Sequence, residues 1–157
     1  CEPSFAHHPA ETLPETTIDG VVLKLILGDA YGMVSPVKAD WPIFYLHAEF
    51  PAGASLAMTD EHEDRAVYIV SGGVAIGGKE YGPGQLVVLK EGATARIAAR
   101  SATRAMLLGG KPLPGARTIW WNFVSSDKDR LERAKALWKA GGFPKVPGES
   151  EFIPLPE

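Results

Sequence analysis

The chain has little of what several classes of protein require. Its single cysteine, Cys1, excludes a framework of internal disulfide bonds and indicates a reducing, cytoplasmic compartment. It has no apolar run long enough to span a bilayer and no signal-peptide pattern, so no membrane partner is expected. The net charge of −3 comes without a block of like charges, which argues against nucleic acid as a partner.

What the chain does have is the composition of one globular domain. Its 157 residues are 45% hydrophobic and 22% charged, which is enough for a proper core. Residues 1–20 are rich in proline and glutamate and do not begin with methionine, so we expect a linker from a longer protein. Residues 21–124 are expected to form a β-barrel and residues 125–142 a helix. Residues 143–157 contain four prolines and are expected to form an extended tail.

Short apolar runs bordered by glycine and proline predict β-strands along most of the chain. They lie at Val21–Leu27, Ile43–Phe50, Ala66–Val70, Val74–Ile76, Leu86–Leu89, Ala95–Ala99 and Ala105–Leu108. The paired glycines in "IGGK" predict a two-residue hairpin, because glycine accepts the positive φ angles of that turn. Short strands separated by turns favour an antiparallel β-sandwich or small barrel over a parallel α/β sheet.

One helix is predicted after the strands. In "SSDKDRLERAKALWKAGGF", Ser126 is the expected N-cap, and two aspartates follow in the first turn, where the helix dipole favours negative charge. Leu131, Ala134 and Trp138 recur at helical spacing and are expected to form an apolar stripe. A pair of glycines then ends the helix.

Residues 52–73, "AGASLAMTDEHEDRAVYIVSGG", resemble the first metal-binding motif of β-barrels of the cupin type. In that motif, alternate strand positions direct two histidines and a glutamate onto one metal ion. Aligning the terminal glycines places Thr59 and Glu61 where the histidines would be, and Arg65 where the glutamate would be. The chain therefore retains the spacing of the motif without its usual ligands.

The fourth ligand position, in "LKEGATA", falls on Ala95. A methyl group and a guanidinium cannot ligate a cation, and the charge of Arg65 would repel one. We therefore expect a barrel that has lost its metal site, with no cofactor in this chain. Glu61 and Arg65 are expected to form an ion pair in the pocket. The pair is either purely structural, which we favour, or able to bind a polar small molecule.

His62 is the remaining candidate ligand. A register shifted by one residue pairs it with Asp60 as a fallback metal site, but that shift would rotate the flanking apolar side chains outward. A lone histidine beside acids at the start of a strand is more often solvated, so we expect His62 at the surface.

The segment "TIWWNFVSSDKDRLERAKALWKAGGFPKVPGESEFIPLPE" resembles the C-terminal end of bacterial pirin-like proteins. "DGVVLKLILGDAYGMVSPV" and "HEDRAVYIVSGGVAIGGKEYGPGQLVVL" resemble the second cupin domain of that family. The resemblance extends from about Glu2 to Glu157. It implies an all-β fold, the cupin double-stranded β-helix barrel, with one C-terminal α-helix and an extended tail.

Pirins consist of two cupin barrels, and the metal, usually iron, lies in the N-terminal one. The resemblance thus implies iron only in the N-terminal barrel of a full-length protein. It also implies quercetin 2,3-dioxygenase activity, or partnership with transcription regulators, for that protein.

For this chain we expect a metal-free, non-catalytic domain with no catalytic residues and a supporting or binding role. Its expected partner is the N-terminal cupin domain, or a second copy bound through the equivalent surface. The alternatives are an enzyme that uses the Glu61–Arg65 pocket and a protein-interaction module formed by Ser126–Ala140 and the tail.

Overall fold

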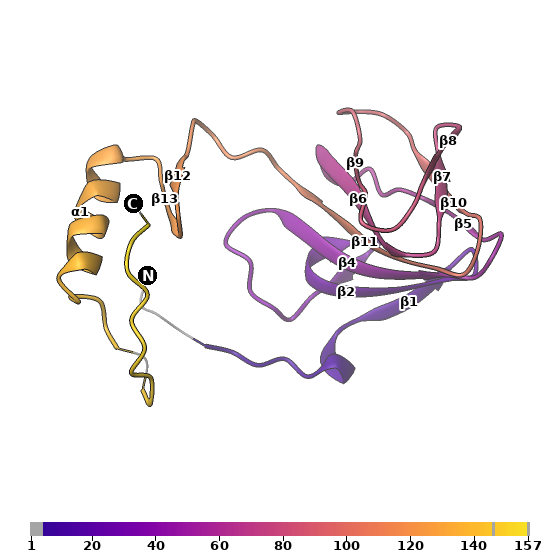
Figure 1. Cartoon of the computed structure of the whole chain (residues 1–157). Coiled ribbons are helices and arrows are strands. Elements are labelled where there is room, and N and C mark those ends of the chain that lie inside the picture. The colour runs from indigo at the N-terminus through magenta and orange to yellow at the C-terminus, as the bar shows by residue number, and fades with distance from the viewer. Residues whose placement is uncertain (1–4, 146, 157) are drawn as a thin grey trace. The chain divides into compact units, whose positions relative to one another are not determined.

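The computed structural model describes residues 5–145 and 147–156 as antiparallel strands with one α-helix (Figure 1). The chain divides into two compact units, a sandwich unit (Cys1–Pro112) and a C-terminal unit (Leu113–Glu157). The sandwich unit contains η1 (Ala10–Thr12), β1 (Glu15–Ile18), β2 (Val21–Ala30), β3 (Met33–Val34), β4 (Ile43–Phe50), β5 (Ser55–Ala57), β6 (Asp64–Ser71), β7 (Val74–Ile76), β8 (Lys79–Tyr81), β9 (Leu86–Val88), β10 (Arg96–Ala99) and β11 (Thr103–Gly110). The C-terminal unit contains β12 (Thr118–Trp120), β13 (Phe123–Ser125) and α1 (Lys128–Lys139). Within the described parts of the chain, no helix is long and apolar enough to cross a membrane.

Two antiparallel sheets make up the sandwich unit. The larger sheet has the strand order β1-β2-β4-β11-β6-β9, with β3 paired to β2. The smaller sheet has the order β5-β10-β7-β8. Neighbouring strands in both sheets run antiparallel, so the predicted antiparallel sandwich is confirmed.

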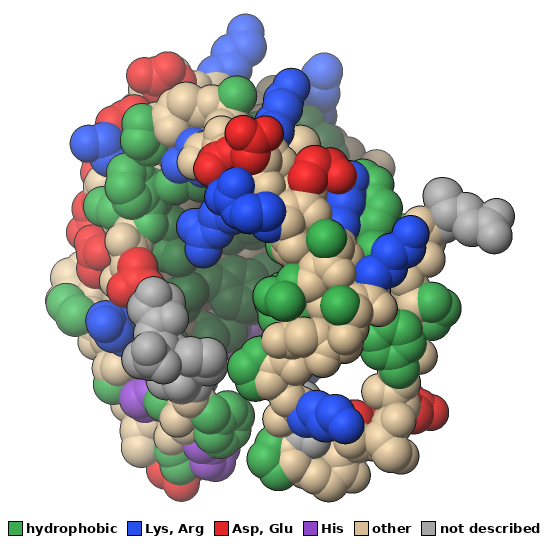
Figure 2. Space-filling view, turned by 90° about the vertical axis from the view of Figure 1, so that its left-hand side faces the viewer, with side chains coloured by type: hydrophobic (Ala, Val, Ile, Leu, Met, Phe, Trp, Pro, Cys, Tyr) green, Lys and Arg blue, Asp and Glu red, His purple; other side chains and the backbone are tan. Residues whose placement is uncertain are grey.

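Alternation along the strands builds the core. On β4, Phe44, Leu46, Ala48 and Phe50 are buried while Tyr45 is exposed, because successive side chains point to opposite faces. Burying a side chain as large as leucine or phenylalanine stabilises a fold by about 1.5–3 kcal/mol. The largest fully buried side chains are Phe44, Leu23, Leu25, Leu46, Leu56, Ile69, Ile97, Leu107, Val21, Val67 and Val74. Several large hydrophobic side chains nevertheless remain exposed, and Figure 2 shows hydrophobic surface among charged side chains on one face.

The predicted boundaries differ from the structure in two places. Glu15–Ile18 pairs with β2, so the larger sheet begins before the expected boundary at Val21. β12 and β13 pair only with each other, and the sandwich unit ends at Pro112 rather than at residue 124. Residues 1–4, part of the predicted linker, lie outside the described residues.

The helix forms where it was predicted, but its N-cap is Asp127 and not Ser126. The Asp127 carboxylate accepts hydrogen bonds from the backbone N–H groups of Asp129 and Arg130, at 2.9 and 3.2 Å. An extended backbone at Asp127 places its side chain over these free N–H groups. The apolar stripe is confirmed, since Leu131 is buried and both Ala134 and Trp138 are half-buried.

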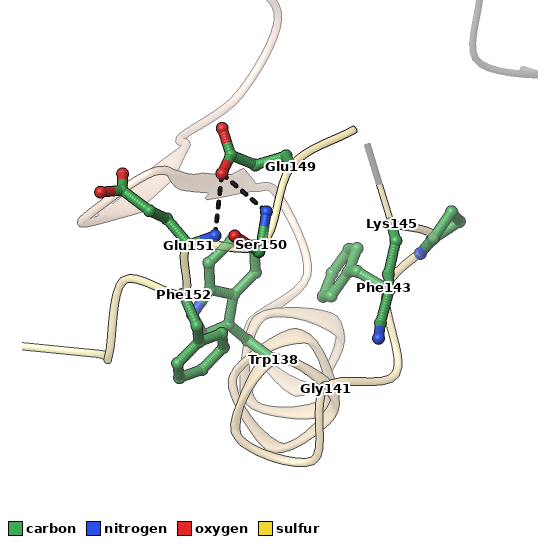
Figure 3. A pocket seen from close by; sticks show the side chains of 9 residues that line it. Trp138, Gly141, Phe143, Lys145, Glu149, Ser150, Glu151 and Phe152 are labelled. Atoms are coloured by element: carbon green, nitrogen blue, oxygen red, sulfur yellow. Dashed lines mark hydrogen bonds between the residues drawn. The ribbon is translucent and has the colours of Figure 1, made fainter. Parts of the chain in front are cut away.

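Aromatic contacts around Trp138 organise the C-terminal unit. Its ring centroid lies 5.3 Å from Trp121, 5.7 Å from Phe143 and 5.8 Å from Phe152. The indole N–H also donates to the carbonyl of Ile153, at 2.8 Å. Figure 3 shows Phe152 beside Trp138, where the tail returns to the helix end. Aromatic packing and one hydrogen bond thus hold a tail that forms no helix or strand in its described residues.

Substitution of Gly28 tests how closely the backbones of β2 and β4 approach each other. Gly28 and Gly20 both have positive φ, 79° and 81°, but a Cβ on Gly28 would overlap the carbonyl of Ile43, whereas Gly20 faces open space. Both Gly→Ala substitutions incur the left-handed backbone penalty, about 1–2 kcal/mol. Gly28→Ala should lose a further 1–3 kcal/mol or so through overpacking. Urea denaturation of both variants measures the difference, and equal losses would contradict this packing.

Candidate functional site

The four positions singled out by the motif alignment line one pocket in the sandwich unit. Thr59, Glu61, Arg65 and Ala95 surround a cavity of about 390 Å³. Tyr31, Ala57, Met58, Asp60 and Thr94 complete its lining. The turn between β2 and β3, the end of β5, the loop to β6, the start of β6 and the residues before β10 contribute these side chains. The retained motif spacing therefore corresponds to a real concavity.

Arg65 is the most deeply buried charge of the pocket, with 3% of its surface exposed. Its Nη1 donates to the carbonyl of Thr59 at 2.9 Å, and its Nη2 donates to the carbonyl of Ala93 at 2.8 Å. The guanidinium therefore joins the loop before β6 to the loop before β10. Its buried Nε has no hydrogen-bond partner within the described part of the chain.

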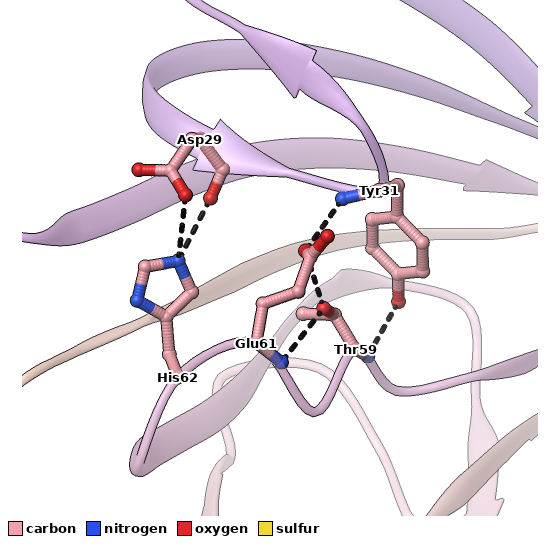
Figure 4. Close-up of polar contacts among 5 residues, drawn as sticks. All are labelled: Asp29, Tyr31, Thr59, Glu61 and His62. Atoms are coloured by element: carbon pink, nitrogen blue, oxygen red, sulfur yellow. Dashed lines mark hydrogen bonds and ion pairs between the residues drawn. The ribbon is translucent and has the colours of Figure 1, made fainter.

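The predicted ion pair between Glu61 and Arg65 is wrong. Among residues 5–145 and 147–156, no carboxylate lies within 4.0 Å of the Arg65 guanidinium. Glu61 instead accepts a hydrogen bond on Oε2 from the Thr59 hydroxyl, at 2.7 Å, and another from the Tyr31 N–H, at 2.8 Å (Figure 4). Local donors thus hold the carboxylate, while backbone carbonyls hold the guanidinium.

These donors also set the charge state of Glu61. The hydrogen bond from the Thr59 hydroxyl is the largest influence, and it lowers the pKa of the Glu61 carboxyl below its ordinary value. Burial opposes this effect, and the backbone N–H groups of Tyr31 and Gly32 reinforce it. Glu61 is therefore a carboxylate at neutral pH, with its negative charge directed toward donors at the end of β2.

Tyr31 is a pocket residue that the motif alignment missed. Its phenol donates to the carbonyl of Ala57 at 2.8 Å and accepts from the N–H of Thr59 at 3.0 Å. Burial of the phenol raises the pKa of Tyr31 to about 12, so the ring stays neutral. The motif has no position for a residue from this turn. The available signal was an aromatic side chain beside a glycine, between two strands, in "DAYGM".

The surface position predicted for His62 is wrong. Only 8% of His62 is exposed, and its Nε2–H donates to the carbonyl of Asp29 at 2.8 Å (Figure 4). Its ring centroid also lies 4.9 Å from that of Phe44. The Asp29 carboxylate lies 3.7 Å from the same nitrogen. Asp60 is exposed at the pocket, whereas His62 is not among the pocket-lining residues. The fallback pair therefore does not share the cavity.

The donor set of the pocket does not fit iron. Of the four motif positions, only Glu61 has a side chain of the kind that iron prefers, and Arg65 adds a fixed positive charge. The described residues contain no group of three or more His, Cys, Asp or Glu side chains that could hold a metal ion. What the pocket offers is one guanidinium, the carboxylates of Asp60 and Glu61, hydroxyl groups and an apolar wall.

The outer face of the larger sheet is a second candidate surface. Tyr45, Leu108, Ala66 and Val88 lie opposite one another across β4, β11, β6 and β9. A neighbouring row consists of His47, Met106, Tyr68 and Leu86. Val88 is 73% exposed and Leu86 is 54% exposed. We call these two rows the outer apolar face.

The Thr59 hydroxyl is expected to stabilise the fold through Glu61. A lowered carboxyl pKa contributes stability above the ordinary value of 4.5, and that stability is lost as the pH falls through the pKa of the folded state. Because Glu61 is exposed, water screens this interaction. Thr59→Val should therefore cost no more than about 1 kcal/mol at neutral pH, and less in acid. Denaturation of wild type, Thr59→Val and the exposed control Thr17→Val across pH tests this. A loss that is independent of pH would contradict the network.

Residues 45–144 match the family model described as the Pirin C-terminal cupin domain. The chain is 46% identical over 160 residues to the pirin-like protein of Caulobacter vibrioides, covering 99% of this chain and 54% of that protein. It is 29% identical over 140 residues to the pirin of Rattus norvegicus, covering 85% of this chain and 48% of that protein. The chain thus spans about half the length of these curated relatives.

The structure is also similar to a crystal structure of quercetin 2,3-dioxygenase from Acinetobacter baumannii. The TM-score is 0.87 at 24% identity, and the match covers 99% of this chain and 53% of the other. This similarity bears on the fold, and together with the family match it confirms the predicted cupin architecture. The chain belongs to the pirin family, as a C-terminal cupin domain of that family.

Proposed function

We propose that this chain is a metal-free, non-catalytic cupin domain that supports a sister barrel or binds a partner. One observation carries the proposal: the Arg65 guanidinium is buried at a ligand position, with two of its N–H groups bonded to backbone carbonyls. A cation placed beside it would meet an uncompensated like charge in a poorly solvated site. The pocket is held together by hydrogen bonds in the region where a catalytic cupin would place metal ligands.

In a full-length protein, we assign the catalytic chemistry to the N-terminal barrel. Iron would be bound there, and a quercetin 2,3-dioxygenase-type reaction would take place there. Two observations support this division. The chain spans 54% of its Caulobacter relative, and its own pocket lacks a fitting set of ligands. We derive no catalytic step for the residues of this chain.

The outer apolar face is the surface we assign to the sister barrel. A contiguous apolar patch on a sheet marks an interaction site, because leaving it in water is unfavourable. Four neighbouring strands contribute to the outer apolar face, so it is broad enough for contact with a second sheet. Without the sister barrel, two copies of this chain should bind through the same face.

A second candidate surface lies in the C-terminal unit. Ile119, Leu137, Phe152 and Ile153 are between 46% and 72% exposed there. This exposure favours the interaction-module alternative, in which the helix and tail bind a protein partner. A pull-down that is unaffected by deletion of Asp127–Glu157 would count against that alternative.

Elemental analysis tests the absence of metal. The purified chain, before and after incubation with Fe(II), should contain iron well below one equivalent, because Arg65 opposes a cation. Arg65→His replaces the guanidinium with a ligand and should increase iron retention, while the exposed control Arg104→His should not. One equivalent of iron in the wild-type chain would contradict the proposal.

Sedimentation velocity tests the outer apolar face. The isolated chain should form dimers, and Val88→Glu should weaken them by about tenfold or more, because it buries a charge at the contact. Val34→Glu is the matched control, since Val34 is similarly exposed, at 75%, but lies on β3. A monomeric wild-type chain, or an equal effect of Val34→Glu, would count against this assignment.

A further inference from the structure

The Arg65 pocket contains a charge without a counter-ion. Arg65 is 97% buried, yet no carboxylate among the described residues is close enough to form an ion pair with it. Buried charges in proteins are usually paired, because removing an isolated ion from water is costly. Two neutral carbonyls satisfy part of the guanidinium, but they do not neutralise it.

The Arg65 guanidinium also has more N–H donors than the two carbonyls beside it accept. Arginine has five N–H groups, of which the carbonyls of Thr59 and Ala93 occupy two. The N–H on Nε is buried and unpartnered. Arg65 lines the cavity with the 3% of its surface that is exposed, and a ligand in the cavity would meet that part of the side chain.

The neighbouring acids limit the kind of anion that fits. Glu61 directs Oε2 toward Thr59 and Tyr31, and Asp60 is exposed, so neither neutralises Arg65. Both would nevertheless repel a multiply charged ligand at the pocket mouth. A single negative charge matches the one free positive charge. Ala57, Met58 and Ala95 supply an apolar wall for the rest of the ligand.

We propose that this pocket binds a small organic monoanion, a carboxylate on a compact apolar body, with the Arg65 guanidinium as its counter-ion. The proposal rests on the proposed function, because it requires a pocket in which a guanidinium stands in place of a metal. The cavity of about 390 Å³ lies in the usual size range for a small-molecule site. The ligand carboxylate takes the place beside Arg65 that Glu61 does not fill.

Benzoate is the probe, and its neutral isostere benzamide and chloride at equal ionic strength are the comparison ligands. In two-dimensional NMR spectra of the full chain, benzoate should shift the amide signals of Thr59, Thr94 and Ala95 in a saturable way. Arg65→Met should weaken benzoate binding by about tenfold or more, because a charge-assisted hydrogen bond is lost. Arg104→Met, which removes an exposed arginine of the larger sheet, should leave binding unchanged.

A second variant keeps the test decisive if Arg65→Met does not fold. Ala95→Leu fills the cavity while retaining the guanidinium, so it should weaken benzoate binding as well. The inference is overturned if the wild-type chain shows no saturable shift, if benzamide or chloride acts like benzoate, or if Ala95→Leu has no effect. A metal-free chain that ignores benzoate would retain the proposed function and lose only this inference, whereas bound iron would remove both.

Discussion

The bridge from the Arg65 guanidinium to the carbonyls of Thr59 and Ala93 is the interaction on which the pocket depends. It joins two loops that continue from the paired strands β5 and β10, where the Met58 N–H also donates to the Ala95 carbonyl, and residues of both loops line the cavity. A metal ion in a cupin barrel would join the same regions through its ligands. Here the Arg65 side chain joins them, and under the proposed function it stands in place of the metal.

The residues that build the cupin sandwich are largely different from the residues that line the pocket. Alternating strands, the buried face of β4 and the close approach at Gly28 build most of the sandwich, and Met58 is a pocket residue that also belongs to its core. The pocket residues lie mostly on connections between strands, which tolerate substitution better than the strands themselves. Under the proposed function, a barrel of this family lacks metal ligands in its pocket and keeps the outer apolar face that we assign to its sister.

Strands and helix could be predicted from the sequence because their signals are local. The alternation of β4 and the stripe of Leu131, Ala134 and Trp138 depend on residues a few positions apart. The pocket position of Arg65 followed from motif spacing, for the same reason. Hydrogen-bond partners could not be predicted, since Glu61 is held by the backbone of Tyr31, thirty residues earlier in the chain.

The central claim is that a guanidinium occupies the place of a metal. The most direct test is a crystal structure of the chain soaked with Fe(II), with anomalous diffraction measured at the iron edge. The account predicts no iron peak in the pocket, and Arg65 bonded to the carbonyls of Thr59 and Ala93. An iron peak beside the Glu61 carboxylate, with Arg65 displaced, would contradict it.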